Sequence, residues 1–311
     1  MNKVIVIAGP TASGKTALSI ELSLAIGGEI VSADSMQIYR GMNIGTAKAT
    51  SDQQSVIRHH MIDILDPSES YSVARYVEDA SACCRNILDQ GHVPVITGGT
   101  GLYIDSLLSG IDFGNYQDDP ELRDSLNKEY DRVGGAALLS RLCEFDPERA
   151  ALLHPSDRKR IIRAFEVYLL SGETITEHDR RTASLPPRYQ ALYIIPGFLD
   201  RNTLYSRIDL RVDEMFRDGL VREVDGLLAS GLSADSTAMQ AIGYKETVSF
   251  LNGNLSLKEC TDLIKQSSRR YAKRQLTWFG RHKDALRLFH DNPDGKDIFK
   301  TAFSEAKEFL S

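Results

Sequence analysis

The segment that most constrains this chain is a glycine-rich loop near its start. An apolar run covers residues 4–8, a loop of the pattern Gly-x4-Gly-Lys-Ser/Thr follows it, and a second apolar run covers residues 17–24. Such a loop turns consecutive backbone N–H groups toward one anion, and the following helix directs its positive N-terminus to the same point. We therefore expect a diphosphate to bind here. The residues of this phosphate loop are Gly9, Pro10, Thr11, Ala12, Ser13, Gly14, Lys15 and Thr16.

Within this loop, two side chains carry expected chemistry. Lys15 adds a full positive charge, and the Thr16 hydroxyl stands where this pattern ligates Mg²⁺. The loop alone does not say which diphosphate it holds, because any diphosphate would fit.

Further apolar runs alternate with helical patterns, which predicts an α/β fold with a parallel sheet. We expect strands at residues 4–8, 29–33, 93–96, 190–195 and 285–289. In open parallel sheets, ligands bind beyond the carboxyl ends of the strands. Asp34 follows the second strand and Thr100 lies in a glycine-rich turn after the third, so both should face the crevice of the phosphate loop. A turn that needs glycine only for its backbone geometry is the alternative for residues 97–101.

The middle of the chain has a different pattern, with helices and no intervening strands. We expect residues 116–188 to form an all-helical insertion in a core made of residues 1–115 and 189–311. A basic cluster in this insertion is either a solvated helix face or a lid or nucleic-acid contact. Its residues are Arg158, Lys159, Arg160 and Arg163.

Composition excludes several other classes of protein. The apolar runs are too short to span a bilayer and no signal peptide is evident, which indicates a cytoplasmic protein with no membrane partner. None of the four cysteines has zinc or redox spacing, so we expect reduced thiols. The adjacent His59 and His60 favour packing or phosphate contact over metal binding, because neighbouring side chains point apart.

Two groups of cations stand out in a chain whose net charge is −6. Arg207 and Arg211 are four residues apart on one helix face, which suits an oxyanion, although ion pairs with Asp209 or Asp213 are an alternative. No acidic residue occurs at positions 263–283, where aromatic residues are interleaved with cations. This stretch is typical of a surface that follows phosphates and stacks bases.

These parts fit two reactions equally well. In a small-molecule or nucleotide kinase with a helical lid, Mg²⁺, Lys15 and the arginines would stabilise the transferred phosphoryl group, and Asp34 would orient the acceptor. The same parts would serve a transferase whose diphosphate is the leaving group. The residues by themselves leave both interpretations open.

Seven blocks of motif residues decide between these interpretations. They are the phosphate loop, Asp34-Ser35-x-Gln37-x-Tyr39, Gly41-Met42-x-Ile44-Gly45-Thr46-Ala47-Lys48, His60-x-x-Asp63, Gly98-Gly99-Thr100-Gly101-Leu102-Tyr103, Ile242-Gly243-Tyr244 and Tyr271-Ala272-Lys273-Arg274-Gln275-x-Thr277-Trp278. In these blocks the sequence closely resembles the tRNA dimethylallyltransferase family, also called tRNA isopentenyltransferases, and it looks like the bacterial form, which is expected to lack a zinc-finger extension. The resemblance implies a P-loop kinase-like core and transfer of a dimethylallyl group from dimethylallyl diphosphate to N6 of the tRNA adenosine next to the anticodon (position 37). The enzyme is expected to act as a monomer.

With this resemblance, the candidate residues acquire roles. Asp34 is the expected general base for the adenine amino group. Lys15, Mg²⁺, Arg211 and the loop amides would stabilise the departing diphosphate, with the Thr100 hydroxyl at its bridging oxygen. The adenosine is expected to be flipped out of its stack, with the insertion gripping the anticodon stem-loop. The expected tRNA contacts are Asp34, Ser35, Met36, Gln37, Thr100, Arg123, Lys159, Arg160, Ile161, Ile162, Arg163, Gln240, Ala241, Ile242, Gly243, Tyr244, Lys245, Lys273 and Arg274.

Overall fold

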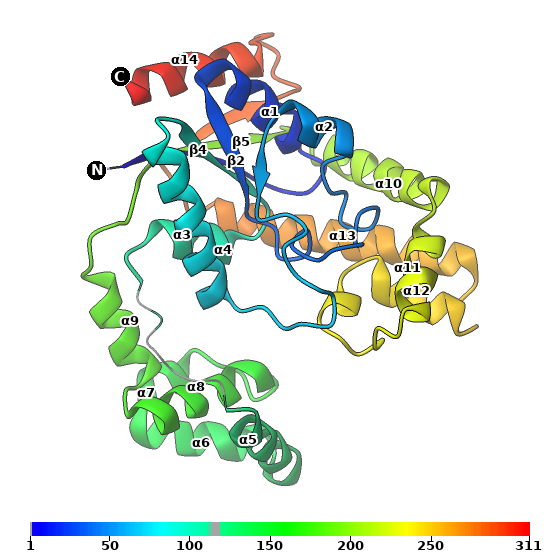
Figure 1. Cartoon of the computed structure of the whole chain (residues 1–311). Helices are drawn as coiled ribbons and strands as arrows, with labels where there is room; N and C mark the ends of the chain where they lie inside the picture. The colour runs from blue at the N-terminus through cyan, green and yellow to red at the C-terminus, as the bar shows by residue number, and fades with distance from the viewer. Residues whose placement is uncertain (1, 112, 114–118) are drawn as a thin grey trace. The chain divides into compact units, whose positions relative to one another are not determined.

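The computed structural model describes residues 2–111, 113 and 119–311 (Figure 1). The chain divides into two compact units. The core unit contains Met1–Leu108 and Arg188–Ser311, and the helical unit contains Ser109–Pro187. The start expected for the insertion, residue 116, lies outside the described residues, and its expected end, residue 188, is one residue beyond the end of the helical unit.

A parallel sheet of six strands forms the centre of the core unit, in the order β3-β2-β4-β1-β5-β6 (Figure 1). All five pairings between neighbours are parallel, as the sequence predicted. The inner strands are apolar and buried on both faces, which is typical of a sheet covered by helices. The strands are β1 Lys3–Ala8, β2 Gly28–Ser32, β3 His59–His60, β4 Val93–Gly98, β5 Gln190–Gly197 and β6 Leu286–Phe289.

Helices cover both faces of this sheet. On one face α1 and α14 pack against each other, and on the other face α3 packs against α4 (Figure 1). The chain passes from β1 to β2 and then returns to β4, which lies between them in the sheet. Because parallel crossovers are right-handed, this change of direction places α1 and α3 on opposite faces. Among the helices formed by the described residues, none is long and apolar enough to cross a membrane. The helices are α1 Lys15–Ile26, α2 Ser51–Val56, α3 Val73–Asp89, α4 Gly101–Leu108 and α14 Ile298–Leu310.

The carboxyl ends of three adjacent strands bring the candidate residues together. Strand β4 lies between β1 and β2 and pairs with both. The phosphate loop follows β1, Asp34 follows β2 and Thr100 follows β4. The sheet order therefore confirms the expected convergence of these three segments at one edge.

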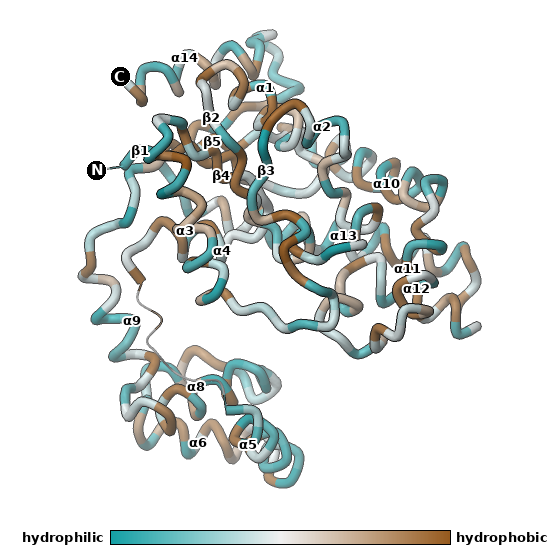
Figure 2. The backbone as a smooth tube through the Cα atoms, in the orientation of Figure 1, coloured by the Kyte–Doolittle hydropathy of each residue, from teal (hydrophilic) through white to brown (hydrophobic). Residues whose placement is uncertain are grey.

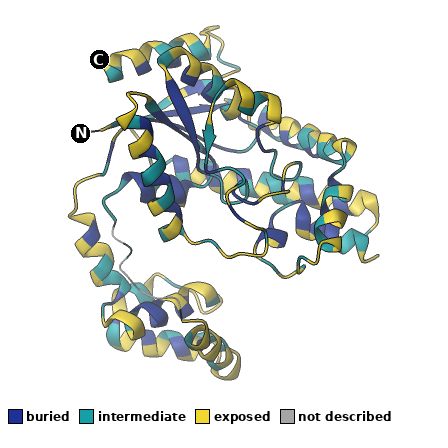
Figure 3. Cartoon of the chain, in the orientation of Figure 1, coloured by how far each residue is buried: buried dark blue, intermediate teal, exposed yellow. Residues whose placement is uncertain are grey.

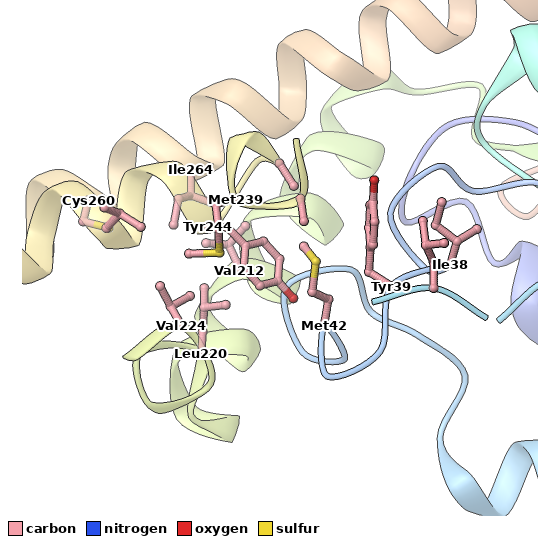
Figure 4. Packing of buried hydrophobic residues seen from close by; sticks show 14 residues of the cluster. Ile38, Tyr39, Met42, Val212, Leu220, Val224, Met239, Tyr244, Cys260 and Ile264 are labelled. Carbon is pink, nitrogen blue, oxygen red and sulfur yellow. The ribbon is translucent and has the colours of Figure 1, made fainter. Parts of the chain in front are cut away.

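A second set of helices packs beside this edge. Their apolar side chains form a cluster that includes Val212, Met239 and Tyr244 (Figure 4). Short polar caps fix where the long helices begin: Asp200 accepts N–H bonds at the start of α10, and Ser256 forms a capping box with Glu259 at the start of α13. The elements are α10 Arg201–Asp218, α11 Leu220–Ala229, the 3₁₀ turn η1 Ala238–Gln240, α12 Tyr244–Leu251 and α13 Leu257–Phe279.

In the helical unit, helices surround a small apolar core of their own, with no strand among its described residues. Leu138, Leu142, Ile161 and Phe165 lie in this core and are buried. Figures 2 and 3 show the consequence on the helices that carry Leu142 and Phe165, where an apolar, buried stripe alternates with a polar, exposed one. The helices are α5 Pro120–Val133, α6 Gly135–Phe145, α7 Pro147–Ala151, α8 Arg158–Ser171 and α9 Ile175–Ala183.

Two short elements were not predicted from the sequence. Strand β3 and helix α2 lie within residues 35–66, where no strand or helix was expected. Strand β3 consists of only two residues, His59 and His60, so no apolar alternation could reveal it.

Candidate active site

The phosphate loop takes the strained backbone that an anion cradle needs. Gly9, Ala12 and Gly14 all have positive φ, at 149°, 63° and 85°. Ala12 is notable because a side chain disfavours this conformation. The Lys15 ammonium donates a 2.6 Å hydrogen bond to the carbonyl of Pro10, so the side chain folds back over its own loop. Burial, followed by repulsion from Arg211, lowers the pKa of Lys15 to about 7, while Asp34 acts in the opposite direction.

Two arginines of α10 hold the same loop. Arg211 Nη1 donates to Thr11 Oγ1 at 3.1 Å, and Arg207 Nε donates to the Ala12 carbonyl at 3.2 Å. Burial lowers the pKa of Arg211, and Asp34 counteracts that shift. The alternative, in which Arg207 and Arg211 pair with Asp209 or Asp213, is wrong, because these two carboxylates pair instead with two cations of α13. The arginines therefore extend the positive lining of the cradle.

Asp34 lies at the end of β2 with one carboxylate oxygen occupied. Its Oδ1 accepts hydrogen bonds from the backbone N–H groups of Met36 (2.9 Å) and Gln37 (3.3 Å). Its Oδ2 has no hydrogen-bond partner among residues 2–111, 113 and 119–311. The turn thus fixes the orientation of the carboxylate and leaves one oxygen available to accept a proton.

The Thr100 hydroxyl connects the ends of β4 and β2. Its Oγ1 accepts a hydrogen bond from the Ser35 backbone N–H at 3.1 Å and lies 3.5 Å from the Ser35 hydroxyl. The Thr100 N–H donates to the carbonyl of Ala33 at 3.1 Å. Thr100 is therefore fixed immediately beside Asp34, although it is not among the residues that line the cavity described next.

A cavity of about 410 Å³, here called the Asp34 cavity, is lined by residues from each predicted group. Its wall contains the phosphate-loop side chains Thr11, Lys15 and Thr16 together with Asp34 and Arg211. Groups predicted to bind the diphosphate, to act as general base and to contact tRNA thus line one cavity. The predicted tRNA contacts that line it are Asp34, Ser35, Met36, Gln37, Gln240, Ala241, Ile242, Lys245 and Arg274.

A second cavity of about 780 Å³, here called the Lys48 cavity, is also lined by residues of the phosphate loop. It shares Lys15, Thr16 and Arg211 with the Asp34 cavity and adds the loop residues Ala12, Ser13 and Gly14. Lys15 and Arg211 thus line both cavities.

Two residues of the predicted segment 240–245 lie elsewhere. Gly243 and Tyr244 are buried, and Tyr244 packs in the apolar cluster of Figure 4. Its hydroxyl donates to Glu223 at 2.6 Å, and a Cβ on Gly45 would lie 2.4 Å from its ring. Contact between the Tyr244 side chain and RNA is contradicted by this burial, since the ring supports the loop that carries Gly45.

Glu223 is a positioning residue that sequence reasoning missed. Its carboxylate accepts hydrogen bonds from the backbone N–H groups of Asn43, Ile44 and Gly45, at 2.8 to 3.2 Å. These bonds fix the loop from which Asn43 and Ile44 line the Lys48 cavity and Gly45 lines the Asp34 cavity. Glu223 is half-buried in an ordinary amphipathic helix, so no sequence signal separated it from the acidic residues of other helices.

The basic stretch of α13 divides into two parts. Lys265 and Arg269 form ion pairs with Asp213 and Asp209, so they fasten α13 to α10. Lys273 and Arg274 are exposed, and the Arg274 guanidinium lies over the Tyr271 ring.

The aromatic residues of this stretch also differ. Tyr271 lines the Asp34 cavity, whereas Trp278 donates its indole N–H to Asp105 at 2.8 Å. Only Tyr271 therefore remains a candidate for stacking on a base in that cavity.

The predicted contact segment of α8 also divides. Lys159, Arg160 and Arg163 are exposed, whereas Ile161 and Ile162 are buried in the core of the helical unit. Side-chain contact of the two isoleucines with RNA is contradicted by this burial.

Two further cations of the helical unit are paired. Arg123 and Arg163 both form ion pairs with the buried carboxylate of Glu166. Since their charges are partly compensated within the unit, Lys159 and Arg160 are the stronger candidates for phosphate contact.

The two adjacent histidines are both hydrogen-bonded inside the core unit, His59 to the carbonyl of Ile57 at 2.9 Å and His60 to Glu29. His60 and His92 each bond one oxygen of Glu29, both at 2.7 Å. Burial acts to raise the pKa of Glu29, but these two hydrogen bonds outweigh it and lower that pKa. Within the described part of the chain, no group of three histidine, cysteine or acidic side chains could hold a metal ion.

Comparisons with known proteins decide among the chemistries that this geometry allows. The family model described as IPP transferase matches residues 37–283, and that described as isopentenyl transferase matches residues 2–65. The chain belongs to the IPP transferase family. A relative named tRNA dimethylallyltransferase 1, from Citrifermentans bemidjiense, is 45% identical over 309 residues, which is 99% of this chain and 97% of the relative.

Solved structures of this family match the whole chain. The tRNA isopentenylpyrophosphate transferase of Bacillus halodurans is 38% identical, with a TM-score of 0.73, and the match covers 100% of this chain and 97% of that one. A eukaryotic dimethylallyltransferase described as acting on tRNA is 26% identical, with a TM-score of 0.86, covering 100% of this chain and 80% of that one. The family is thus matched in both sequence and fold.

Proposed function

We propose that this chain is a tRNA dimethylallyltransferase, which moves the dimethylallyl group from dimethylallyl diphosphate to N6 of the adenosine next to the anticodon and releases diphosphate. One observation carries the proposal: the phosphate loop and the Asp34 carboxylate open into the same cavity, in a chain of this family. A cytoplasmic location and a monomeric state stay predictions.

Asp34 acts on the acceptor. An adenine amino group is a weak nucleophile, and removal of its proton as the new C–N bond forms contributes about a hundred- to ten-thousandfold in rate. Because Oδ1 is held by two backbone N–H groups, Oδ2 is the oxygen that receives the proton. The fixed turn supplies the orientation that efficient proton transfer requires.

The phosphate loop acts on the leaving group. Negative charge develops on the diphosphate as its bond to carbon breaks, and prearranged donors stabilise that charge. The backbone N–H groups of residues 12–16 supply such donors, and Lys15 and Arg211 add positive charge. The Thr100 hydroxyl, fixed beside Asp34, is assigned to the bridging oxygen on the family resemblance.

The residues fit a bound Mg²⁺. Mg²⁺ keeps several waters and takes substrate phosphates as ligands, so one protein hydroxyl suffices. Thr16 is exposed and lines both cavities, which suits that role. Mg²⁺ would supply neutralisation of the diphosphate charge.

The RNA is held by cations at two places. Lys273 and Arg274 flank the Asp34 cavity on α13, and Lys159 and Arg160 lie on the exposed face of α8. The adenosine must leave its stack to reach Asp34, and Tyr271 offers it an aromatic face. Charge on the helical unit then holds the surrounding stem-loop through its phosphates.

A labelled-donor assay tests this function. The protein is incubated with an anticodon stem-loop and either dimethylallyl diphosphate labelled in the prenyl group or ATP labelled at the γ-phosphate. We expect prenyl label in RNA, with one diphosphate released for each group transferred. Transfer of the γ-phosphate, with no prenylated RNA, would establish the kinase alternative instead.

A further inference from the structure

A buried amide joins the two glycine-rich turns of the active site. Gln275 of α13 is 5% exposed. Its Oε1 accepts a hydrogen bond from the Thr11 backbone N–H at 2.9 Å, and its Nε2 donates one to the Gly99 carbonyl at 3.0 Å. One side chain therefore spans the phosphate loop after β1 and the Thr100 turn after β4.

The Gly99 turn lies close against this amide. A Cβ added to Gly99 would lie 2.2 Å from Nε2 of Gln275, so a side chain at position 99 would clash with the amide. Burial raises the pKa of Tyr271 to about 12, and its neighbours Thr100 and Gln275 act in the opposite direction. The same tyrosine hydroxyl is thus sensitive to both Gln275 and the candidate group Thr100.

The two bonds require both halves of an amide. A carboxylate can accept from Thr11 but cannot donate to Gly99, and its charge would face the Gly99 carbonyl. A protonated carboxyl group restores both bonds, because it has one hydroxyl donor and one carbonyl acceptor. An apolar side chain of similar length makes neither bond at any pH.

We propose that Gln275 is a positioning residue that sets the distance between the phosphate loop and the Thr100 turn, and so places the diphosphate relative to the acceptor. The inference rests on the proposed function. Both reacting groups must be held within fractions of an ångström, so a shift between these turns lowers kcat more than it weakens donor binding.

The test compares Gln275→Glu with wild type across pH in the prenyl-transfer assay. At neutral pH we expect kcat to fall about ten- to a hundredfold with KM for the donor changed less than about threefold. As pH falls from about 8 to about 5.5, the ratio of variant to wild-type kcat should rise, since burial raises the pKa of the new carboxyl group above its ordinary value. A ratio that stays constant with pH overturns the proposal.

Two controls complete the experiment. Gln266→Glu places the same charge on an exposed position of the same helix and should keep wild-type kcat at every pH. Gln275→Met retains volume and should lose kcat without recovery at low pH. Should Gln275→Glu fail to fold, Gln275→Met decides: wild-type kcat at an unchanged melting temperature overturns the proposal. A wild-type protein that prenylates no RNA would instead contradict the proposed function, so the two failures are distinguishable.

Discussion

The cations beside the phosphate loop of the core unit and those on α8 of the helical unit are held in different ways. In the core unit, Lys15 and Arg211 are hydrogen-bonded to the phosphate loop and both have lowered pKa values, with burial as the largest cause. In the helical unit, Lys159 and Arg160 project from α8 into solvent while Ile161 of the same helix is buried. The difference indicates two tasks, because fixed charges suit one defined leaving group, whereas mobile exposed charges suit the phosphates of a nucleic acid.

The largest expected effect lies at Asp34 in the core unit. Asp34→Asn keeps the size of the side chain and removes its ability to take a proton, so kcat should fall about a hundred- to ten-thousandfold. Affinity for the stem-loop should change less than about twofold, as measured by fluorescence anisotropy. Asp262→Asn, at an exposed position of α13, is the control and should behave as wild type. Weakened RNA binding with normal kcat would contradict the assignment of Asp34 as the general base.

Next in size is a packing effect in the helical unit. Ile161→Ala opens a cavity in a fully buried position and should cost about 2–5 kcal/mol of the free energy of unfolding. Leu169→Ala on the same helix, where the side chain is 55% exposed, should cost much less. Denaturant unfolding followed by circular dichroism measures both. Equal stabilities would show that Ile161 is not a core residue.

The third prediction concerns Lys15 and pH. A bound diphosphate raises the pKa of Lys15, so binding above about pH 7 requires uptake of a proton. Affinity for a thio analogue of the donor should therefore be full below about pH 7 and fall up to about tenfold per pH unit as pH rises toward the pKa of the bound state.

Calorimetry on Lys15→Arg tests the origin of this pH dependence. Arginine stays charged across this range, so the variant should show a much flatter affinity profile. If wild type and variant have the same pH profile, Lys15 is not the titrating group.

The smallest effect is expected from the exposed cations. Changing Lys159 and Arg160 together to glutamine should weaken stem-loop binding several-fold and lower its salt slope by about one unit for each phosphate that is no longer neutralised, with kcat unchanged. Arg180→Gln, which removes a cation already paired with Glu148, is the matched control and should affect binding less. An unchanged salt slope in the double variant would show that these residues form only a solvated helix face and contact no phosphate.

Much of the fold was predictable because its signals are local. The alternation of strands and helices and caps such as Asp119 and Ser256 can be read from neighbouring residues. Strand β3 could not be predicted, since two residues show no period and depend on pairing with β2.

The site residues also differ in whether local sequence could predict them. The motifs that follow each strand revealed the phosphate loop, Asp34 and Thr100. Gln275 and Glu223 act through backbone atoms that lie far away in sequence, so nothing near them indicates their contacts. A run of motif residues also does not reveal burial, which is why Ile161, Ile162 and Tyr244 were assigned to RNA with their exposed neighbours.

A crystal structure of the protein with diphosphate and an anticodon stem-loop would test the central claim most directly. The account predicts diphosphate against the backbone N–H groups of residues 12–16, and a flipped adenosine whose N6 lies within hydrogen-bonding distance of Oδ2 of Asp34. An adenosine still stacked in its loop, or an N6 directed away from Asp34 with diphosphate bound elsewhere, would contradict it.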